Sequence, residues 1–190
     1  MNRRDFIRLS AIAGGSFIAS NWLFETEVAN AVTNEVVSKN GMLQLTLVAD
    51  EKLIKYRDTT RWAMTYNGVF PAPTLRANPG DTLKIKLVNK LSQATNLHTH
   101  GLHVSPEKNS DNPLVIIKPG ASYEYEIKIP KTQKSGTFWY HPHHHELSAG
   151  QVASGLAGVL VVEDALDEKP IIKNSTERLI VLAEIGRAHV

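Results

Sequence analysis

The sequence contains no cysteine, and this absence excludes two kinds of chemistry at once. Disulfide bonds and thiolate ligands or nucleophiles are both unavailable within the 190 residues. An excess of charge of one sign is also lacking, because 21 lysine and arginine residues balance 19 acidic residues to a net charge of +2. So small a charge gives no basis for binding nucleic acid or an anionic membrane surface. We therefore expect no nucleic-acid partner.

Long helical periodicity and internal repeats are missing from the sequence as well. Apolar and polar residues instead alternate in the short segments 42–50, 82–89 and 122–130, which indicates half-buried strands. The segment 158–164 is a continuous apolar run, as in a strand buried on both faces. Stretches rich in Pro, Gly, Asn and Asp separate these segments. The pattern predicts an all-β sandwich or barrel.

The first 31 residues have the features of a targeting segment that is not part of the fold. A basic start is followed by a mostly apolar run, and Ala29 and Ala31 form an A-x-A cleavage site. The pair Arg3 and Arg4 resembles the twin-arginine export signal of bacteria. We expect residues 1–31 to direct the protein through the twin-arginine machinery to the periplasm or the outside of the cell. A membrane-anchoring helix is the alternative interpretation.

The strand segments predict one domain over residues 32–164. A polar stretch follows, and then the apolar run ERLIVLA at 177–183. Because a lone strand cannot bury its own face, we interpret residues 165–190 as a linker and the truncated start of a second domain. The last residues, 184–190 (EIGRAHV), coincide with a translated sequencing adapter, which indicates a sequencing artefact.

Seven of the eight histidines lie in two short stretches, NLHTHGLH and WYHPHHHE. Residues i and i+2 of a strand point to the same face, so His98 and His100 are expected to project together. His141 and His143 have the same spacing across Pro142. Proline cannot donate to a strand ladder, so this second pair is expected at an edge, a bulge or a strand end.

Two such pairs brought side by side would offer four imidazoles to a metal ion. Neutral imidazole suits copper, zinc, iron or nickel, whereas calcium and magnesium prefer oxygen ligands. A single histidine of this kind would more often be a surface or core residue. Two His-x-His pairs in an exported β protein favour a metal site.

The sequences around both histidine pairs resemble the first two copper motifs of the multicopper oxidases, the family of laccases, bilirubin oxidases and bacterial cuprous oxidases. The motifs here are NLHTHGLHVSP and GTFWYHPHHHELSAGQVASGLAGVLVVED, and the flanking NGVFPAPTLRANPGDTLKIKLVN and IKPGASYEYEIKIP also match. The resemblance spans residues 43–164. It implies a Greek-key cupredoxin (plastocyanin-like) domain from the N-terminal part of an oxidoreductase. Such enzymes couple oxidation of a substrate to four-electron reduction of dioxygen to water.

The resemblance also implies a role for each matched histidine. His98 would bind the type 2 copper, and His100, His141 and His143 would bind the type 3 copper pair. Family members carry an acidic residue between the two motifs that helps to supply protons, and Asp111 is the nearest match.

Other residues of the motifs lie outside the matched ligand positions. We expect His103, His144 and His145 to be surface or supporting residues, with His145 near the edge of the site. Trp139 and Tyr140 are expected to pack in the core. Gly101, directly after the first histidine pair, is expected to permit a close approach of the backbone.

The departures from the family pattern concern the remaining ligands. In the family, four more cluster histidines come from a C-terminal domain, and a cysteine near the C-terminus binds the type 1 copper that accepts electrons. The chain lacks any cysteine. The resemblance therefore implies half of a cluster without electron entry, inactive alone and dependent on missing C-terminal cupredoxin domains. The reducing substrate is chosen at the type 1 site, so phenols, bilirubin-like pigments, Cu(I) and Mn(II) all remain open.

Three other interpretations compete with the oxidase. A stand-alone exported copper carrier would use the same four histidines, and only the reading frame beyond Val190 discriminates it. The first domain of a copper nitrite reductase would itself carry a type 1 cysteine, which is absent. A purely structural extracellular β domain leaves the clustered histidines unexplained.

Overall fold

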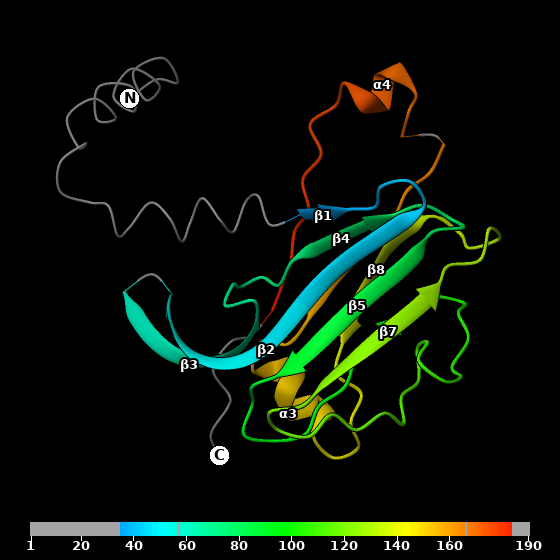
Figure 1. The fold of residues 1–190 in the computed structure, drawn as a ribbon. Helices are drawn as coiled ribbons and strands as arrows, with labels where there is room; N and C mark the ends of the chain where they lie inside the picture. The colour runs from blue at the N-terminus through cyan, green and yellow to red at the C-terminus, as the bar shows by residue number, and fades with distance from the viewer. Residues whose placement is uncertain (1–34, 57, 166, 184–190) are drawn as a thin grey trace, which may run out of the picture. The chain divides into compact units, whose positions relative to one another are not determined.

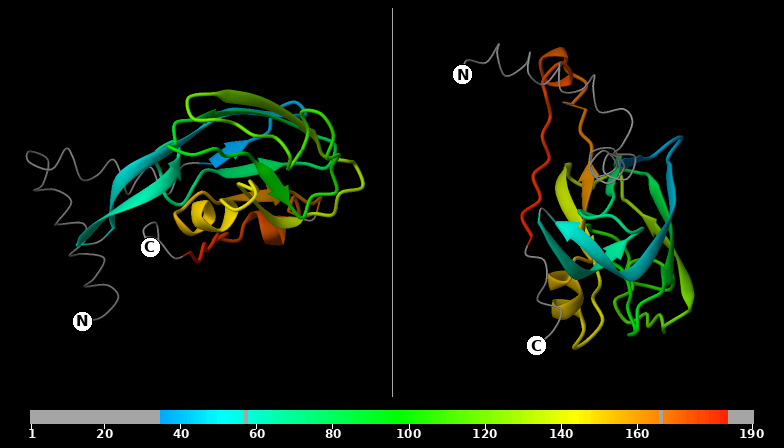
Figure 2. Two further views of the ribbon diagram at one scale, coloured as in Figure 1. Left: turned by 90° about the horizontal axis from the view of Figure 1, so that it is seen from below. Right: turned by 90° about the vertical axis from the view of Figure 1, so that its left-hand side faces the viewer.

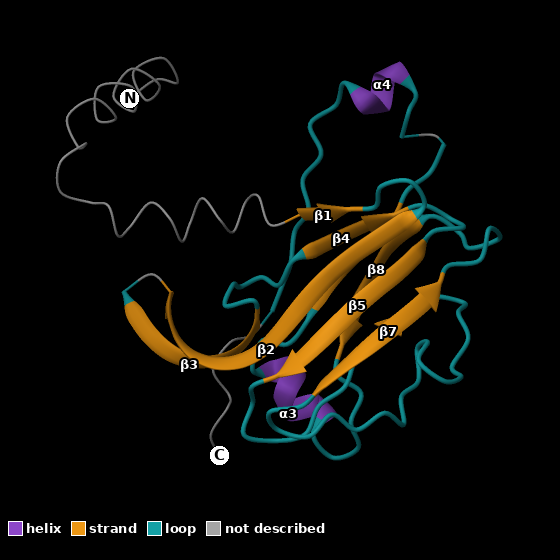
Figure 3. Cartoon of the chain, viewed as in Figure 1, coloured by secondary structure: helices purple, strands orange, loops and turns teal. Residues whose placement is uncertain are grey.

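The strands of this protein form two sheets with the apolar core between them (Figures 1 and 2). A computed structural model describes residues 35–56, 58–165 and 167–183. The predicted export signal at 1–31 and the segment 184–190 lie outside the described residues. Strands and loops make up most of the described chain, with little helix (Figure 3), as the alternation of apolar residues predicted.

The first sheet has five strands and carries the histidine stretches. Its strands, in spatial order, are β1 (Glu35–Val37), β4 (Thr74–Ala77), β9 (Gly158–Val162), β8 (Gly136–His141) and β6 (His98–His100). The pairs β1–β4 and β4–β9 are parallel, whereas β9–β8 and β8–β6 are antiparallel. The short strand β6 therefore lies at one edge of this sheet.

The second sheet has four strands. In spatial order these are β3 (Thr59–Tyr66), β2 (Met42–Tyr56), β5 (Thr82–Asn89) and β7 (Ser122–Lys128). The strands β2 and β5 are parallel neighbours, so the chain between them cannot be a tight hairpin and instead passes through β4 of the first sheet. This crossing between sheets joins the two layers of the predicted β-sandwich.

The core is built from the inward-facing residues of both sheets. In β5, Leu83, Ile85 and Leu87 are buried, and in β7 the same alternation buries Tyr125 and Ile127. Full burial of one such aliphatic side chain contributes about 2 kcal/mol to folding. The two-residue period that predicted these strands is thus the pattern that fills the core.

The strand β9 differs in part from its prediction. Its inward residues Leu160 and Val162 are buried, but Val159 and Val161 on the other face are only half-buried. Val161 lines a surface depression together with Ile172 from the following polar stretch. One face of β9 is therefore in the core, and the other is only partly covered.

The described residues after β9 contain one further element, the four-residue helix α4 (Pro170–Lys173). The run 177–183, expected as the first strand of a second domain, forms no strand among the described residues, and its assignment to a second domain stays a prediction. Ile180 and Leu182 are largely exposed there, because an apolar run becomes a strand only when a partner accepts its backbone hydrogen bonds. The helix α3 (Ser148–Ala153) precedes β9, and no helix in the described ranges is long and apolar enough to cross a bilayer.

Candidate metal centre

The two histidine stretches meet because β6 and β8 are antiparallel neighbours. His98 pairs directly with His141, and His100 pairs with Trp139. Between them Thr99 pairs with Tyr140, and both of these residues are buried in the core. Because side chains alternate along a strand, the histidines of β6 and β8 project together from the opposite face of the sheet.

Four imidazole rings gather at this edge of the first sheet. The ring centroid of His98 lies 5.7 Å from that of His100, 5.4 Å from that of His141 and 5.1 Å from that of His143. The rings of His141 and His100 are 5.7 Å apart, and those of His141 and His143 are 6.2 Å apart. The structure thus brings together all four histidines that the sequence singled out, and His143 lies just after the end of β8, as Pro142 predicted.

His141 is the most buried of the four and has a defined donor arrangement. Its Nδ1 lies 2.8 Å from the carbonyl oxygen of Pro142, which can only accept, so Nδ1 carries the proton. Its Nε2 is buried and has no hydrogen-bond partner. Burial, with the nearby rings of His98, His100 and His143, lowers the pKa of His141. The ring is therefore neutral near pH 7, with the Nε2 lone pair available.

His98 is oriented by the buried carboxylate of Asp111. Its Nδ1 lies 3.1 Å from Oδ1 of Asp111, which also accepts from the backbone N–H of Thr99 at 3.1 Å. The hydroxyl of Thr99 donates to Oδ2 of Asp111 at 3.0 Å. A histidine that donates Nδ1–H to a carboxylate presents Nε2 for a metal, as metal-binding histidines commonly do. Asp111 therefore contacts the site through His98.

Trp139 does not pack in the core, and this expectation was wrong. It is 37% exposed, and its ring stacks on His141 with centroids 4.0 Å apart and planes inclined by 19°. The ring centroid of Trp139 also lies 5.2 Å from that of His100. The reason is the period of two, because Trp139 and His141 are i and i+2 on the outer face while Tyr140 faces inward. Tyr140 is fully buried, as predicted.

The other motif residues lie around this cluster. A Cβ on Gly101, at φ +91°, would come within 2.8 Å of the Phe138 ring, which confirms the expected close approach. His103 is exposed, and His144 is half-buried with Nδ1 2.9 Å from the backbone oxygen of His145. The His145 side chain is 93% exposed and faces solvent beside Glu146 instead of the edge of the site.

A buried amide that sequence reasoning missed connects the two histidine stretches. Asn96 is fully buried and accepts a hydrogen bond of 2.6 Å from the backbone N–H of His143. The only sequence signal is its position two residues before His98. This signal is weak, because asparagine side chains are mostly exposed in folded proteins.

The donor set fits a transition metal such as copper. Imidazole nitrogens are suitable ligands for such a metal, and the buried Nε2 of His141 would cost free energy if it stayed unsatisfied. Among the residues that the structure describes, no three His, Asp or Glu side chains are placed to enclose one metal ion. The arrangement therefore offers each metal ion an incomplete ligand set from this chain.

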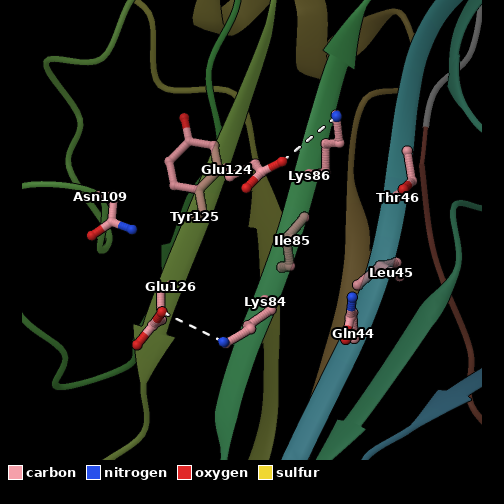
Figure 4. Close-up of a pocket in the computed structure, with 10 residues that line it drawn as sticks. All are labelled: Gln44, Leu45, Thr46, Lys84, Ile85, Lys86, Asn109, Glu124, Tyr125 and Glu126. Atoms are coloured by element: carbon pink, nitrogen blue, oxygen red, sulfur yellow. Dashed lines mark ion pairs between the residues drawn. The ribbon is translucent and has the colours of Figure 1, made fainter.

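A separate surface pocket of about 300 Å³ lies over β2, β5 and β7 of the second sheet (Figure 4). Two ion pairs between β5 and β7 cross it, Lys84–Glu126 at 3.8 Å and Lys86–Glu124 at 3.6 Å. No histidine lines this pocket, so it is distinct from the histidine cluster.

Several known proteins are similar to this chain. The family model described as multicopper oxidase matches residues 48–167. A multicopper oxidase of Staphylococcus epidermidis is 42% identical over 127 residues, which cover 66% of this chain and 28% of the relative. Copper resistance protein A of Pseudomonas syringae pv. tomato is 31% identical over 185 residues, covering 96% of this chain and 29% of the relative.

Solved structures give the same result. The multicopper oxidase from Campylobacter jejuni, titled a metallo-oxidase, is 37% identical with a TM-score of 0.60, covering 66% of this chain and 26% of that one. The chain thus spans less than a third of the length of these relatives. By the family model over residues 48–167 and these relatives, the chain belongs to the multicopper oxidase family.

Proposed function

We propose that this chain supplies half of the ligands of a trinuclear copper centre in a multicopper oxidase. His98 would bind the type 2 copper, and His100, His141 and His143 would bind the type 3 pair. The observation that carries the proposal is the convergence of these four rings, with the Nε2 atom of His141 buried and unpartnered. When bound, copper would supply the electron transfer that reduces dioxygen to water.

The relatives support an oxidase as the activity of the parent protein. They bear the names multicopper oxidase, copper resistance protein and laccase. The co-substrates would be dioxygen and a phenol-like or metal-ion reductant. Since the 190 residues contain no cysteine, a type 1 copper and the other cluster ligands would need residues of further cupredoxin domains.

The proposal extends to the organisation of the chain. Residues 32–164 would be the copper-binding domain, residues 1–31 a twin-arginine signal, and residues 165–190 a linker and the truncated start of a second domain, with 184–190 as a sequencing artefact. The sequence features of the first segment support delivery to the periplasm or secretion.

Copper titration of the full chain tests the ligand set. We expect wild-type protein to bind Cu(II) reversibly, with nitrogen hyperfine structure in its electron paramagnetic resonance spectrum. Loss of a residue that only supports a ligand already lowers metal affinity about 10- to 100-fold. His98→Ala and His141→Ala should therefore lower it at least about tenfold. The exposed His145 is the matched control, and His145→Ala should bind as wild type does. Equal loss in all three variants would contradict the ligand set.

A chimera separates the oxidase from a stand-alone copper carrier. The matched 127-residue segment of the Staphylococcus epidermidis enzyme would be replaced by the corresponding segment of this chain. We expect the chimera to consume dioxygen with a phenolic reductant. His141→Ala should abolish this consumption and keep the blue type 1 colour, which reports that the protein has folded. A blue but inactive chimera with all four histidines intact would favour the carrier.

A further inference from the structure

His143 is the one histidine of the cluster that no strand holds. His98, His100 and His141 belong to β6 or β8, where ladder pairing fixes the backbone. The strand β8 ends at His141, and Pro142 follows without a backbone N–H. His143 is also exposed. Its backbone needs another anchor if its ring is to stay beside that of His98.

Side chains supply this anchor at the peptide unit between Pro142 and His143. The carbonyl oxygen of Pro142 accepts from Nδ1 of His141 at 2.8 Å and from the hydroxyl of Ser148 at 2.6 Å. On the other side, the N–H of His143 donates to Oδ1 of Asn96 at 2.6 Å. Both polar groups of this peptide unit are thereby held, and Asn96 is the partner that reaches it from the first histidine stretch.

Asn96 also holds the loop that follows Asp111. Its amide nitrogen donates to the carbonyl oxygen of Pro113 at 2.9 Å and to that of Val115 at 3.1 Å. Two carbonyl acceptors on one side and an N–H donor on the other fix the orientation of the amide. One buried side chain thus joins three segments, which carry His98, Asp111 and His143.

We propose that Asn96 is a positioning residue of the copper centre, which sets His143 and the Asp111 loop relative to His98. This inference rests on the proposed function. Asn96 has no direct access to the metal in this role, since its polar atoms are all engaged with backbone groups. It acts through the backbone position of His143 and through the loop that follows Asp111.

The test compares two asparagines with the same burial and bonding. Asn89 is also fully buried, donates to the carbonyl oxygens of Gln93 and Ile117, and accepts from the N–H of Leu91. An aspartate at either position would place an oxygen against two carbonyl oxygens, so both substitutions should destabilise the fold similarly. We expect Asn96→Asp to lower copper affinity about 10- to 100-fold. Asn89→Asp should leave copper affinity unchanged. Equal effects of the two on copper affinity would overturn the proposal.

A double-mutant cycle shows whether the effect runs through His143. In a His143→Ala background we expect Asn96→Asp to lower copper affinity by a clearly smaller factor than in wild type, because one of the two ligands that it positions is gone. An undiminished additional loss would overturn the proposal.

Amide hydrogen exchange of the wild-type chain provides a test that does not require any variant to fold. The N–H of His143 should be protected although it lies outside the strand and its residue is exposed, and free exchange would overturn the proposal. Absence of any copper binding by wild-type protein would overturn the proposed function and this assignment with it. Wild-type binding that survives Asn96→Asp would overturn the role of Asn96 alone.

Discussion

His98 and His141 face each other directly across β6 and β8, with ring centroids 5.4 Å apart. The neighbouring pair, Thr99 and Tyr140, points the other way into the core. A shift of this register by one residue would bury histidines and expose Tyr140. Packing of the core therefore enforces the pairing on which the proposed metal centre depends.

The stack of Trp139 on His141 predicts a fluorescence signal of metal binding. Cu(II) quenches nearby indole rings, and the two ring centroids are only 4.0 Å apart. We expect copper to quench Trp139 emission in proportion to site occupancy, as measured by fluorescence titration.

Trp62 provides the control for this measurement, because it lies on β3 of the second sheet and is 51% exposed. Trp62→Phe should keep the quenching, and Trp139→Phe should remove it. Quenching that persists in Trp139→Phe but disappears in Trp62→Phe would place the copper away from the histidine cluster.

Much of the fold and the histidine cluster could be predicted from the period of two. The alternation in β5 and β7 identified the inward residues, and the two His-x-His spacings identified which rings share a face. The same rule also contradicts the expectation that Trp139 and Tyr140 both pack in the core, since adjacent strand residues face opposite sides. Trp139 could have been predicted as a neighbour of His141 from sequence.

Other features depend on contacts that no local pattern carries. Asn96 is buried because a loop and the second histidine stretch supply its hydrogen-bond partners, and these come from distant parts of the chain. The run 177–183 has the composition of a strand, but strand formation depends on a pairing partner. The parallel pairing of β2 with β5 likewise follows from the tertiary fold.

Gly158 is predicted to be irreplaceable, because its cross-strand partner Tyr140 lies against its Cα. A Cβ at this position would overlap the phenol ring, whose hydroxyl is held by the carbonyl oxygen of Pro73 at 2.6 Å. Gly158→Ala should lower the free energy of unfolding by about 3 kcal/mol or more. Urea denaturation measures this change.

The helical Gly150 is the matched control, since a Cβ there would meet nothing within 4 Å. Gly150→Ala should stabilise the protein by about 0.5–1 kcal/mol. Similar destabilisation by both substitutions would show that contact with Tyr140 is not the cause.

Arg76 is predicted to connect the first sheet to the stretch after α4. Its guanidinium contacts Glu35, and it pairs with Glu163 at 2.8 Å and Glu177 at 2.6 Å. Arg76→Met leaves three carboxylates close together and should cost about 2 kcal/mol in unfolding free energy. Glu177 is 64% exposed, so Glu177→Gln should change stability by less than about 0.5 kcal/mol. Urea denaturation measures both changes in the free energy of unfolding. An equal loss in Arg76→Met and Glu177→Gln would contradict the prediction that Arg76 contributes more.

Three buried tyrosines predict a loss of stability in alkali. Burial raises the pKa of Tyr66, Tyr125 and Tyr140 in the folded protein. Their protonated form is therefore favoured by folding, and this stability is complete below the unfolded pKa of about 10 and is lost as the pH rises above it. For three groups, the free energy of unfolding should fall by about 4 kcal/mol per pH unit in this range. The midpoints of urea denaturation at several pH values measure this fall. Phenolate absorbance equivalent to more than two of the five tyrosines, in protein that is still folded, would contradict this prediction.

Asp111 is predicted to orient His98 mainly through the acceptor geometry of its side chain. Asp111→Asn keeps an oxygen for Nδ1 of His98 and the N–H of Thr99, and its amide can donate to the Thr99 hydroxyl. Asp111→Ala removes all three contacts and leaves their partners unsatisfied. We expect Asp111→Ala to lower copper affinity about 10- to 100-fold and Asp111→Asn to lower it less.

The same pair of variants distinguishes orientation from proton supply. In the active chimera, Asp111→Asn retains the orientation of His98 but has no carboxyl proton to give. If Asp111 supplies protons to dioxygen reduction, oxygen consumption should fall far more than copper affinity does. If it only orients His98, the two should fall together, as measured by oxygen electrode and copper titration on the same preparation. A chimera in which Asp111→Ala keeps both full affinity and full activity would show that neither role is needed.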